Sequence, residues 1–182
     1  MSIGSDYRTR LRTGVDKLRR WLADWGVEKP ANLRGFTFGA TPGGGAPATS
    51  IAIPYPAATG SQSGYRYDPG SGRYLRTMGG GAHVDGNSAA QLAFDNVLVQ
   101  FVPHEATNIV EDSLGSTSIR LNLFGSGRAL LFRDGQAFDL IWRSDSRGDM
   151  PRLYAADGQE VPLKTGRTWI SIVPLDYTIT YR

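Results

Sequence analysis

The segment from His83 to Asn87, His-Val-Asp-Gly-Asn, combines side chains that could do chemistry. On a strand, His83 and Asp85 would share a face, so the carboxylate could orient the imidazole as a general base, or both could bind a metal ion. Asp95 or His104 could help to bind such an ion, although a chain with two histidines cannot form a His-rich zinc site. The interpretation that we favour is simpler: His83 is a loop residue that hydrogen-bonds Asp85 or Asn87. We therefore expect no bound metal and no other cofactor.

The segment before this motif is a predicted hairpin in which arginine and tyrosine alternate. Residues 68–72, Asp-Pro-Gly-Ser-Gly, have the composition of a turn, and they join predicted strands at 65–68 and 73–78. Such a ribbon could grip a carboxylate, a sugar or a nucleic-acid strand. We favour the alternative of an exposed hairpin with cross-strand packing of tyrosine on arginine. The alternating residues are Tyr65, Arg66, Tyr67, Arg73, Tyr74 and Arg76.

A polar pair, Asp95-Asn96, stands at the start of the most apolar stretch of the chain. Residues 97–102 are predicted to form a central strand buried on both faces, where a charge is costly unless it has a partner. Three glycines at 79–81 allow the backbone to bend sharply just before the His-x-Asp motif. We therefore hypothesise one polar pocket that collects His83, Asp85, Asp95 and Asn96, rimmed by Arg66 or Arg76. The alternative is that Asp95 only caps loop amides. The ligand-binding candidates are Arg66, Tyr67, Arg73, Tyr74, Arg76, His83, Asp85, Asn87, Asp95 and Asn96.

Composition excludes several classes of protein. The chain has no cysteine, which excludes thiolate catalysis, disulfides and Cys-ligated zinc. Residues 1–34 carry eight Lys or Arg and four Asp or Glu, so the rest of the chain has one net negative charge within a total of +3. That balance weighs against nucleic-acid binding. No apolar run approaches the roughly 20 residues of a membrane helix, and no signal peptide opens the sequence.

The periodicity of apolar residues predicts a mainly β (α+β) fold. Residues 1–12 read as a mobile basic N-terminal segment, followed by one β-rich domain over 13–182 that begins with an amphipathic helix at 14–25. About ten strands separated by short turns favour an antiparallel sandwich or curled half-barrel. The helix is predicted to pack Trp21 and Leu22 onto that β core, a membrane-surface helix being the alternative. Asp134-Gly135 predicts a tight hairpin, and residues 107–116 predict a loop.

Several short segments together form a pattern that is specific to a known family. They are Tyr65-Arg66-Tyr67-Asp68, Arg73-Tyr74-Leu75-Arg76, His83-Val84-Asp85, Gln91-Leu92, Asp95-Asn96-Val97-Leu98-Val99-Gln100, Leu130-Leu131-Phe132-Arg133-Asp134-Gly135 with Trp142, and Gly166-Arg167-Thr168-Trp169-Ile170. Over roughly residues 13–174 the chain resembles the C-terminal domain of the YerB-type bacterial lipoproteins (DUF3048), a domain of unknown function.

The resemblance implies an extracytoplasmic protein, tethered to the membrane through a lipid anchor, and it supplies no catalytic residues. The signal, the lipid-bearing cysteine and the N-terminal domain of that family are absent from this sequence. We expect a non-catalytic domain of a bacterial cell-envelope lipoprotein that binds a cell-wall component or an envelope protein, and no nucleic acid. The alternative is a hydrolase or transferase acting on envelope polymer, with His83 as base and Asp85 as its orienter.

Overall fold

The computed structural model describes residues 13–30, 35–146 and 149–182. The chain divides into two compact units, Met1–Leu33 and Arg34–Arg182, and each is described by itself. The predicted basic segment 1–12 lies outside the described residues.

The first unit contains one helix, α1 (Val15–Asp24), in agreement with the helix predicted at 14–25. Gly14 is its N-cap, and Gly26 follows its end with φ of 63°, which suits a residue without a side chain. The rings of Trp21 and Trp25 lie 4.7 Å apart. No residue of the helix is buried within this unit, and Trp21 is 51% exposed. The packing of Trp21 and Leu22 against the β core stays a prediction.

None of the helices in the described residues has both the length and the apolar character needed to cross a membrane.

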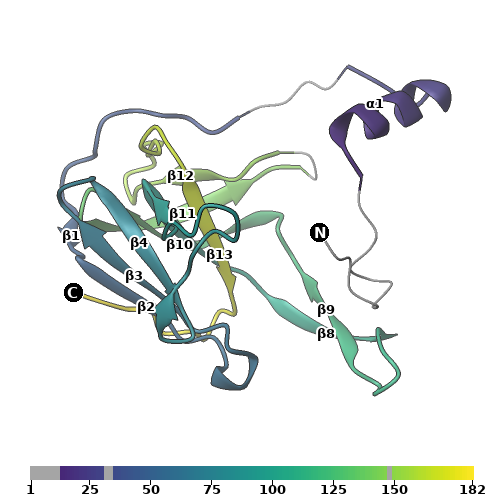
Figure 1. Cartoon of the computed structure of the whole chain (residues 1–182). Coiled ribbons are helices and arrows are strands. Elements are labelled where there is room, and N and C mark those ends of the chain that lie inside the picture. The colour runs from purple at the N-terminus through teal and green to yellow at the C-terminus, as the bar shows by residue number, and fades with distance from the viewer. Residues whose placement is uncertain (1–12, 31–34, 147–148) are drawn as a thin grey trace. The chain divides into compact units, whose positions relative to one another are not determined.

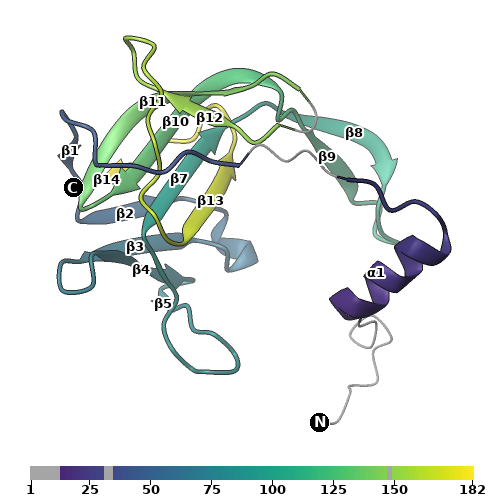
Figure 2. The ribbon, with the colours of Figure 1, turned by 90° about the horizontal axis from the view of Figure 1, so that it is seen from above.

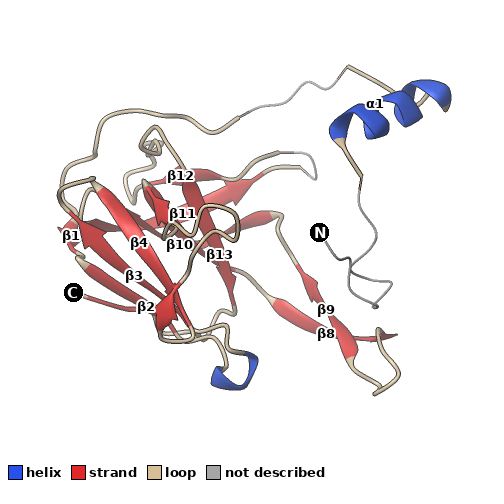
Figure 3. Ribbon diagram, in the orientation of Figure 1, coloured by secondary structure: helices blue, strands red, loops and turns tan. Residues whose placement is uncertain are grey.

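The regular secondary structure of the second unit is almost entirely β-strand, joined by loops, as Figures 1 and 3 show. One sheet has the order β1-β11-β10-β7-β13, with β12 beside β11. Its strands are β1 (Ala46–Pro47), β7 (Asn96–Phe101), β10 (Gly125–Arg133), β11 (Gln136–Ser144), β12 (Arg152–Tyr154) and β13 (Thr168–Val173). The other has the order β14-β2-β3-β4-β5, with β6 beside β4. Its strands are β2 (Ser50–Ile53), β3 (Ser63–Asp68), β4 (Arg73–Met78), β5 (Gly81–Ala82), β6 (Ala93–Phe94) and β14 (Thr180–Tyr181).

A separate hairpin and a short 3-10 turn complete the unit. β8 (His104–Val110) pairs with β9 (Thr117–Leu121), so residues 107–110 of the loop predicted at 107–116 are strand and 111–116 form the connection. The polar residues at 107–108 favoured a loop because a strand with one buried face alternates apolar and polar residues. The β8–β9 hairpin is largely exposed, so its strands do not need that alternation. The 3-10 turn η2 spans Ala57–Thr59.

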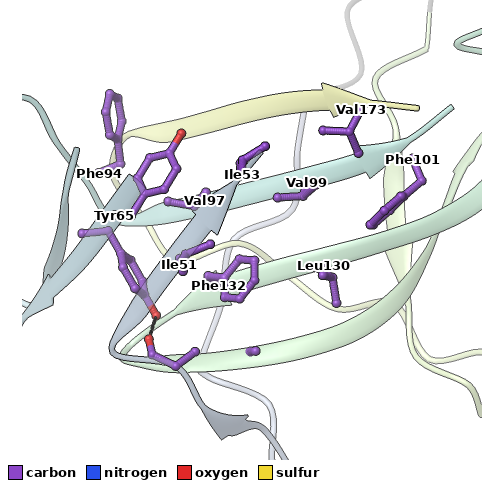
Figure 4. Packing of buried hydrophobic residues seen from close by; sticks show 13 residues of the cluster. Ile51, Ile53, Tyr65, Phe94, Val97, Val99, Phe101, Leu130, Phe132 and Val173 are labelled. Carbon is purple, nitrogen blue, oxygen red and sulfur yellow. Dashed lines mark hydrogen bonds between the residues drawn. The ribbon is translucent and has the colours of Figure 1, made fainter. Parts of the chain in front are cut away.

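The two large sheets pack face to face around an apolar core. Figure 4 shows side chains of both sheets interleaving there. This cluster contains Ile51, Ile53, Tyr65, Tyr74, Val97, Val99, Phe101, Leu130, Phe132 and Val173. A second cluster covers the other face of the β7 sheet, with Leu98, Leu131, Trp142, Leu153 and Leu163 among its members. Because both faces are covered, every residue of β7 is buried, which confirms the predicted central strand.

The two predicted hairpins are confirmed by strand register. Arg133 pairs with Gln136, and the two residues between them, Asp134 and Gly135, have φ of 53° and 73°. Two successive residues with positive φ are the signature of a type I′ turn, which suits the right-handed twist of the strands that it joins. Asp68 pairs with Arg73 across the other turn.

One pairing departs from the expected antiparallel arrangement. β13 runs parallel to β7, with Thr168 opposite Asn96 and Val173 opposite Phe101. Figure 2 shows the two strands side by side. Parallel neighbours need a long connection, and here that connection includes the β8–β9, β10–β11 and β12 segments. β13 is the last strand in the order of its sheet and so forms one edge of it.

Candidate functional site

The return strand of the arginine and tyrosine ribbon, β4, turns Arg76 into the protein. Tyr74 and Arg76 are buried while Leu75 between them is only half-buried, as the alternation of a strand requires. Arg76 is 4% exposed. A guanidinium held so far from water needs partners for both its N–H groups and its charge.

Four neighbours surround the Arg76 guanidinium. Its Nη2 donates to Ser63 Oγ at 2.8 Å, and its Nε to the Tyr65 hydroxyl at 3.4 Å. Its Nη1 contacts Nδ1 of His83. Its Cζ lies 4.0 Å from the ring centre of Trp169, a distance suited to a cation–π contact. None of these four neighbours is a carboxylate, and no carboxylate forms an ion pair with Arg76 within the described residues.

A hollow of about 400 Å³ opens beside this guanidinium, between β13 of one sheet and β3 and β4 of the other. Its volume is within the range of small-molecule sites. Tryptophan and tyrosine rings, a methionine and an isoleucine supply apolar wall, while serine, histidine and arginine supply polar groups. The lining residues are Tyr55, Ser61, Ser63, Arg76, Met78, His83, Trp169, Ile170 and Ser171.

Ser171 brings a buried hydroxyl to the hollow, close to the hydroxyl groups of Tyr55 and Tyr65. It is 2% exposed, and its Oγ is the one buried side-chain N or O atom without a partner in the described part of the chain. The nearby tyrosines stay protonated: burial raises the pKa of Tyr55 and of Tyr65, and the Ser171 hydroxyl and, for Tyr65, the Arg76 contact only partly offset that rise. Tyr55 donates to the carbonyl of Ile172 at 2.9 Å. The hydroxyl hydrogen of Tyr55 is therefore used within the protein, and the Ser171 hydroxyl is the group of the hollow that can donate to a ligand beside the Arg76 cation.

The predicted pocket around His83 is only partly formed. His83 meets Arg76, but Asp85 accepts hydrogen bonds from the amides of Asn87 and Ser88 and from the Ser88 hydroxyl, so it caps its own turn. These bonds to the carboxylate lower the pKa of Asp85. His83 and Asp85 share no hydrogen bond in the described structure, so the pairing of a base with its orienter is not formed.

Asp95 and Asn96 hold the start of β7 to the segment that leads into β13. Asp95 accepts from Arg73 Nε at 3.3 Å and from the Arg167 amide at 2.9 Å. Asn96 bonds both backbone groups of Lys164, donating to its carbonyl and accepting from its amide, each at 2.8 Å. Capping of loop amides, the alternative for Asp95, is what the structure shows, and the carboxylate lies too close to Gly166 for a side chain there.

The remaining candidates of the ribbon have other roles. Arg66 is exposed on β3. Tyr74 is fully buried and donates to the carbonyl of Ala48 at 2.9 Å, and the Tyr67 ring lies 5.2 Å from its ring. Asn87 is exposed in the turn capped by Asp85. No group of three His, Asp or Glu side chains that could hold a metal ion occurs in residues 13–30, 35–146 and 149–182.

A second buried arginine, Arg133, gives a useful contrast with Arg76. Arg133 is 2% exposed and donates to Asp134 at 3.0 Å and to the carbonyls of Pro162 and Gly39 at 2.9 and 3.1 Å. Lys164 Nζ also pairs with Asp134, at 2.7 Å. Burial acts to raise the pKa of Asp134, but hydrogen bonds from Lys164, Thr41 and Arg133 lower it to about 2. Arg133 thus pairs with an acid, whereas Arg76 has no acidic partner in the part of the chain that the structure describes.

Of the nine residues that line the Arg76 hollow, sequence reasoning proposed only Arg76 and His83, and among those it missed are Tyr55, Trp169 and Ser171. The signal for Ser171 was available, because it stands in the apolar run Trp-Ile-Ser-Ile-Val at a position whose neighbours two residues away face the core. Tyr55 and Trp169 carried no such signal, since an aromatic residue in a strand is ordinarily core.

Comparison with known proteins adds a family to this geometry. Residues 51–170 match the family described as "Protein of unknown function (DUF3048) C-terminal domain". The chain is 29% identical over 110 residues to "Putative lipoprotein YerB" of Bacillus subtilis (strain 168), and the aligned region covers 60% of this chain and 30% of the relative. The crystal structure of YerB protein from Bacillus subtilis has the same fold, with a TM-score of 0.67 and 23% identity, and the match covers 92% of this chain and 54% of that one.

The chain therefore spans about a third to a half of the length of these relatives. The match with the family runs from β2 through β12 and ends within β13, so it contains most of the Arg76 hollow. On this evidence the chain belongs to the DUF3048 family, and its β unit is the C-terminal domain of that family.

Proposed function

We propose that this domain binds an anionic group of a bacterial cell-envelope component in the hollow beside Arg76, and that it does so as the non-catalytic part of a lipoprotein held outside the cytoplasm. The observation that carries the proposal is a guanidinium that is 4% exposed and lacks a carboxylate partner in the described chain. The relative named as a lipoprotein supports the location.

The energetics of burial favour an anion over a neutral ligand. Removing a guanidinium from water costs several kcal/mol, and an opposite charge with good hydrogen-bond geometry offsets that cost best. Guanidinium has five N–H groups, and three protein acceptors account for three of them. A carboxylate or phosphate oxygen is the partner that suits the remaining donors. The hydroxyl of Ser171, which lacks a partner, could donate to the same anion.

Binding fits the geometry better than catalysis does. The hydrolase or transferase alternative needs His83 activated by Asp85, and those two side chains have separate partners. With its Nδ1 against Arg76, His83 instead limits how the guanidinium can turn. The residues of the hollow therefore favour binding of a negatively charged group over catalysis.

The test is a titration of the whole chain with sodium acetate or inorganic phosphate. Binding is monitored through the chemical shifts of the tryptophan indole N–H signals in NMR. We expect a saturable shift of the Trp169 signal that Arg76→Gln removes. Arg66→Gln is the matched control, because Arg66 is exposed on the neighbouring strand, and it should bind as the unaltered protein does.

Arg76→Lys guards against misfolding, since it keeps the charge at the site and loses only the fork of donors. It should retain weak binding. Absence of any saturable shift in the unaltered protein, or equal loss of binding in Arg66→Gln, would show that the hollow is not an anion site.

A further inference from the structure

The edge strand β13 lies against the same hollow. β13 has β7 on one side, and no strand of the described chain pairs with its other side. An unpaired strand edge presents a row of backbone N–H and C=O groups to which another extended chain can add. Ile170, in the middle of β13, is 37% exposed and lines the hollow.

The direction of the free backbone groups follows from two hydrogen bonds. The carbonyl of Arg167 accepts from the Asn96 amide at 3.1 Å, and the carbonyl of Val173 accepts from the Val102 amide at 3.0 Å. Successive residues of a strand point their backbone groups to opposite sides, so residues 167, 169, 171 and 173 are directed at β7. Thr168, Ile170 and Ile172 are directed at the open edge.

One of the edge groups already has a partner. The carbonyl of Ile172 accepts from the Tyr55 hydroxyl at 2.9 Å, which closes the edge at that point. The amide and carbonyl of Ile170 have no such partner among the described side chains. The open stretch is therefore short, and it ends where Tyr55, Arg76 and Ser171 line the hollow.

From this juxtaposition we infer the class of ligand: the C-terminal end of an extended peptide. Its backbone adds to the edge of β13 by pairing with Ile170, and its terminal carboxylate enters the hollow and binds Arg76. The backbone pairing gives affinity for an extended chain of any sequence, whereas the buried charge selects for the free carboxylate. This inference rests on the proposed function, because it uses the same cation.

The test uses acetyl-tetraalanine with a free carboxylate, its C-terminal amide, and acetate. We expect the acid peptide to bind at least about tenfold more tightly than acetate, and the amide form to bind no better than acetate. On binding, hydrogen exchange at the Ile170 amide should slow, while the exchange at the Trp169 amide, which already faces β7, should not change.

N-methylation of the peptide gives the sharpest discrimination without altering the protein. Only alternate amides of an added strand face β13, so methylating one alternate set should abolish the gain over acetate, and methylating the other set should leave it. Equal effects of the two sets, or a peptide no tighter than acetate, would overturn strand addition while leaving Arg76-dependent anion binding in place.

Two other outcomes also count against the inference. Failure of both acetate and peptide to bind would refute the proposed function, and the peptide inference with it. Concentration-dependent self-association that protects the Ile170 amide would show that β13 pairs with a second copy of the chain instead.

Discussion

Replacing Asp134 by asparagine tests whether the cluster of Arg133, Asp134 and Lys164 stabilises the β unit through charge. Asp134 occupies the first position of the type I′ turn, with φ of 53°. Asparagine accepts that conformation as readily as aspartate does, and Asn-Gly is a favoured pair for this turn. Asp134→Asn therefore keeps the turn and removes the negative charge that pairs with Arg133 and Lys164.

The magnitude follows from the pKa of Asp134. A pKa lowered from 3.8 to about 2 corresponds to roughly 2.5 kcal/mol at about 1.4 kcal/mol per pH unit. The side chains of Asp134 and Lys164 are 25% and 28% exposed, so water screens part of this interaction. We expect Asp134→Asn to lower the free energy of unfolding by about 1–2 kcal/mol at pH 7, or the melting temperature by about 3–6 °C for a chain of this size.

The pH dependence has a definite sign. In the unfolded chain Asp134 gains a proton near pH 3.8, whereas in the folded protein it does so only near pH 2. Its contribution is therefore complete well above pH 4 and is lost progressively as the pH falls toward 2. Urea unfolding of both proteins at pH 7 and at pH 3 should show a smaller difference at pH 3.

Asp157→Asn is the matched control, because Asp157 precedes a glycine in an exposed turn and bonds only the Gln159 amide, at 3.0 Å. It should change the free energy of unfolding by less than about 0.5 kcal/mol. If Asp134→Asn is as stable as the unaltered protein at pH 7, or if its deficit is the same at both pH values, charge pairing at Asp134 does not stabilise the fold.

Two further substitutions test the turn and the hollow. Gly135→Val should cost about 2–4 kcal/mol in urea unfolding, because φ is 73° and a side chain there would meet the Tyr67 ring at 3.0 Å; an unchanged midpoint would contradict the turn geometry. Ser171→Ala should change the free energy of unfolding by less than about 1 kcal/mol, since the buried hydroxyl forms no well-aligned hydrogen bond, while weakening anion binding. A stability loss together with unchanged acetate binding would show that Ser171 is a structural residue alone.

Much of the fold could be predicted because local rules and tertiary structure agree. The Asp134-Gly135 turn and the buried strand at 97–102 follow from residue types in short windows. Helix α1 formed where its stripe predicted, but the partner of that stripe is a tertiary property that periodicity does not contain. The parallel pairing of β13 with β7 is another such property, because its partners are distant in sequence.

The site was predicted in part, and for a physical reason. Arg76 and His83 were both candidates, and their side chains are in contact. Their backbones are also hydrogen-bonded, because the His83 amide donates to the Arg76 carbonyl at 3.0 Å. Asp85 was grouped with them because it is near in sequence, and Asp95 because a charge at the start of a buried strand needs a partner. Asp85 instead caps an amide three positions away and Asp95 an amide 72 positions away, and no pattern of residue types distinguishes a cap from a pocket ligand.

The pairing of β14 with β2 bears on when the β unit can fold during synthesis. Thr49 Oγ1 and the Ser50 amide both bond the carbonyl of Arg182, at 3.1 and 2.9 Å, and Thr49 and Arg182 are 133 positions apart. Until the last of these residues leaves the ribosome, β2 has an open edge and Ile51 and Ile53 lack a complete sheet around them. Because this pairing joins segments distant in sequence, we expect it to form late in folding and to slow the folding of the β unit.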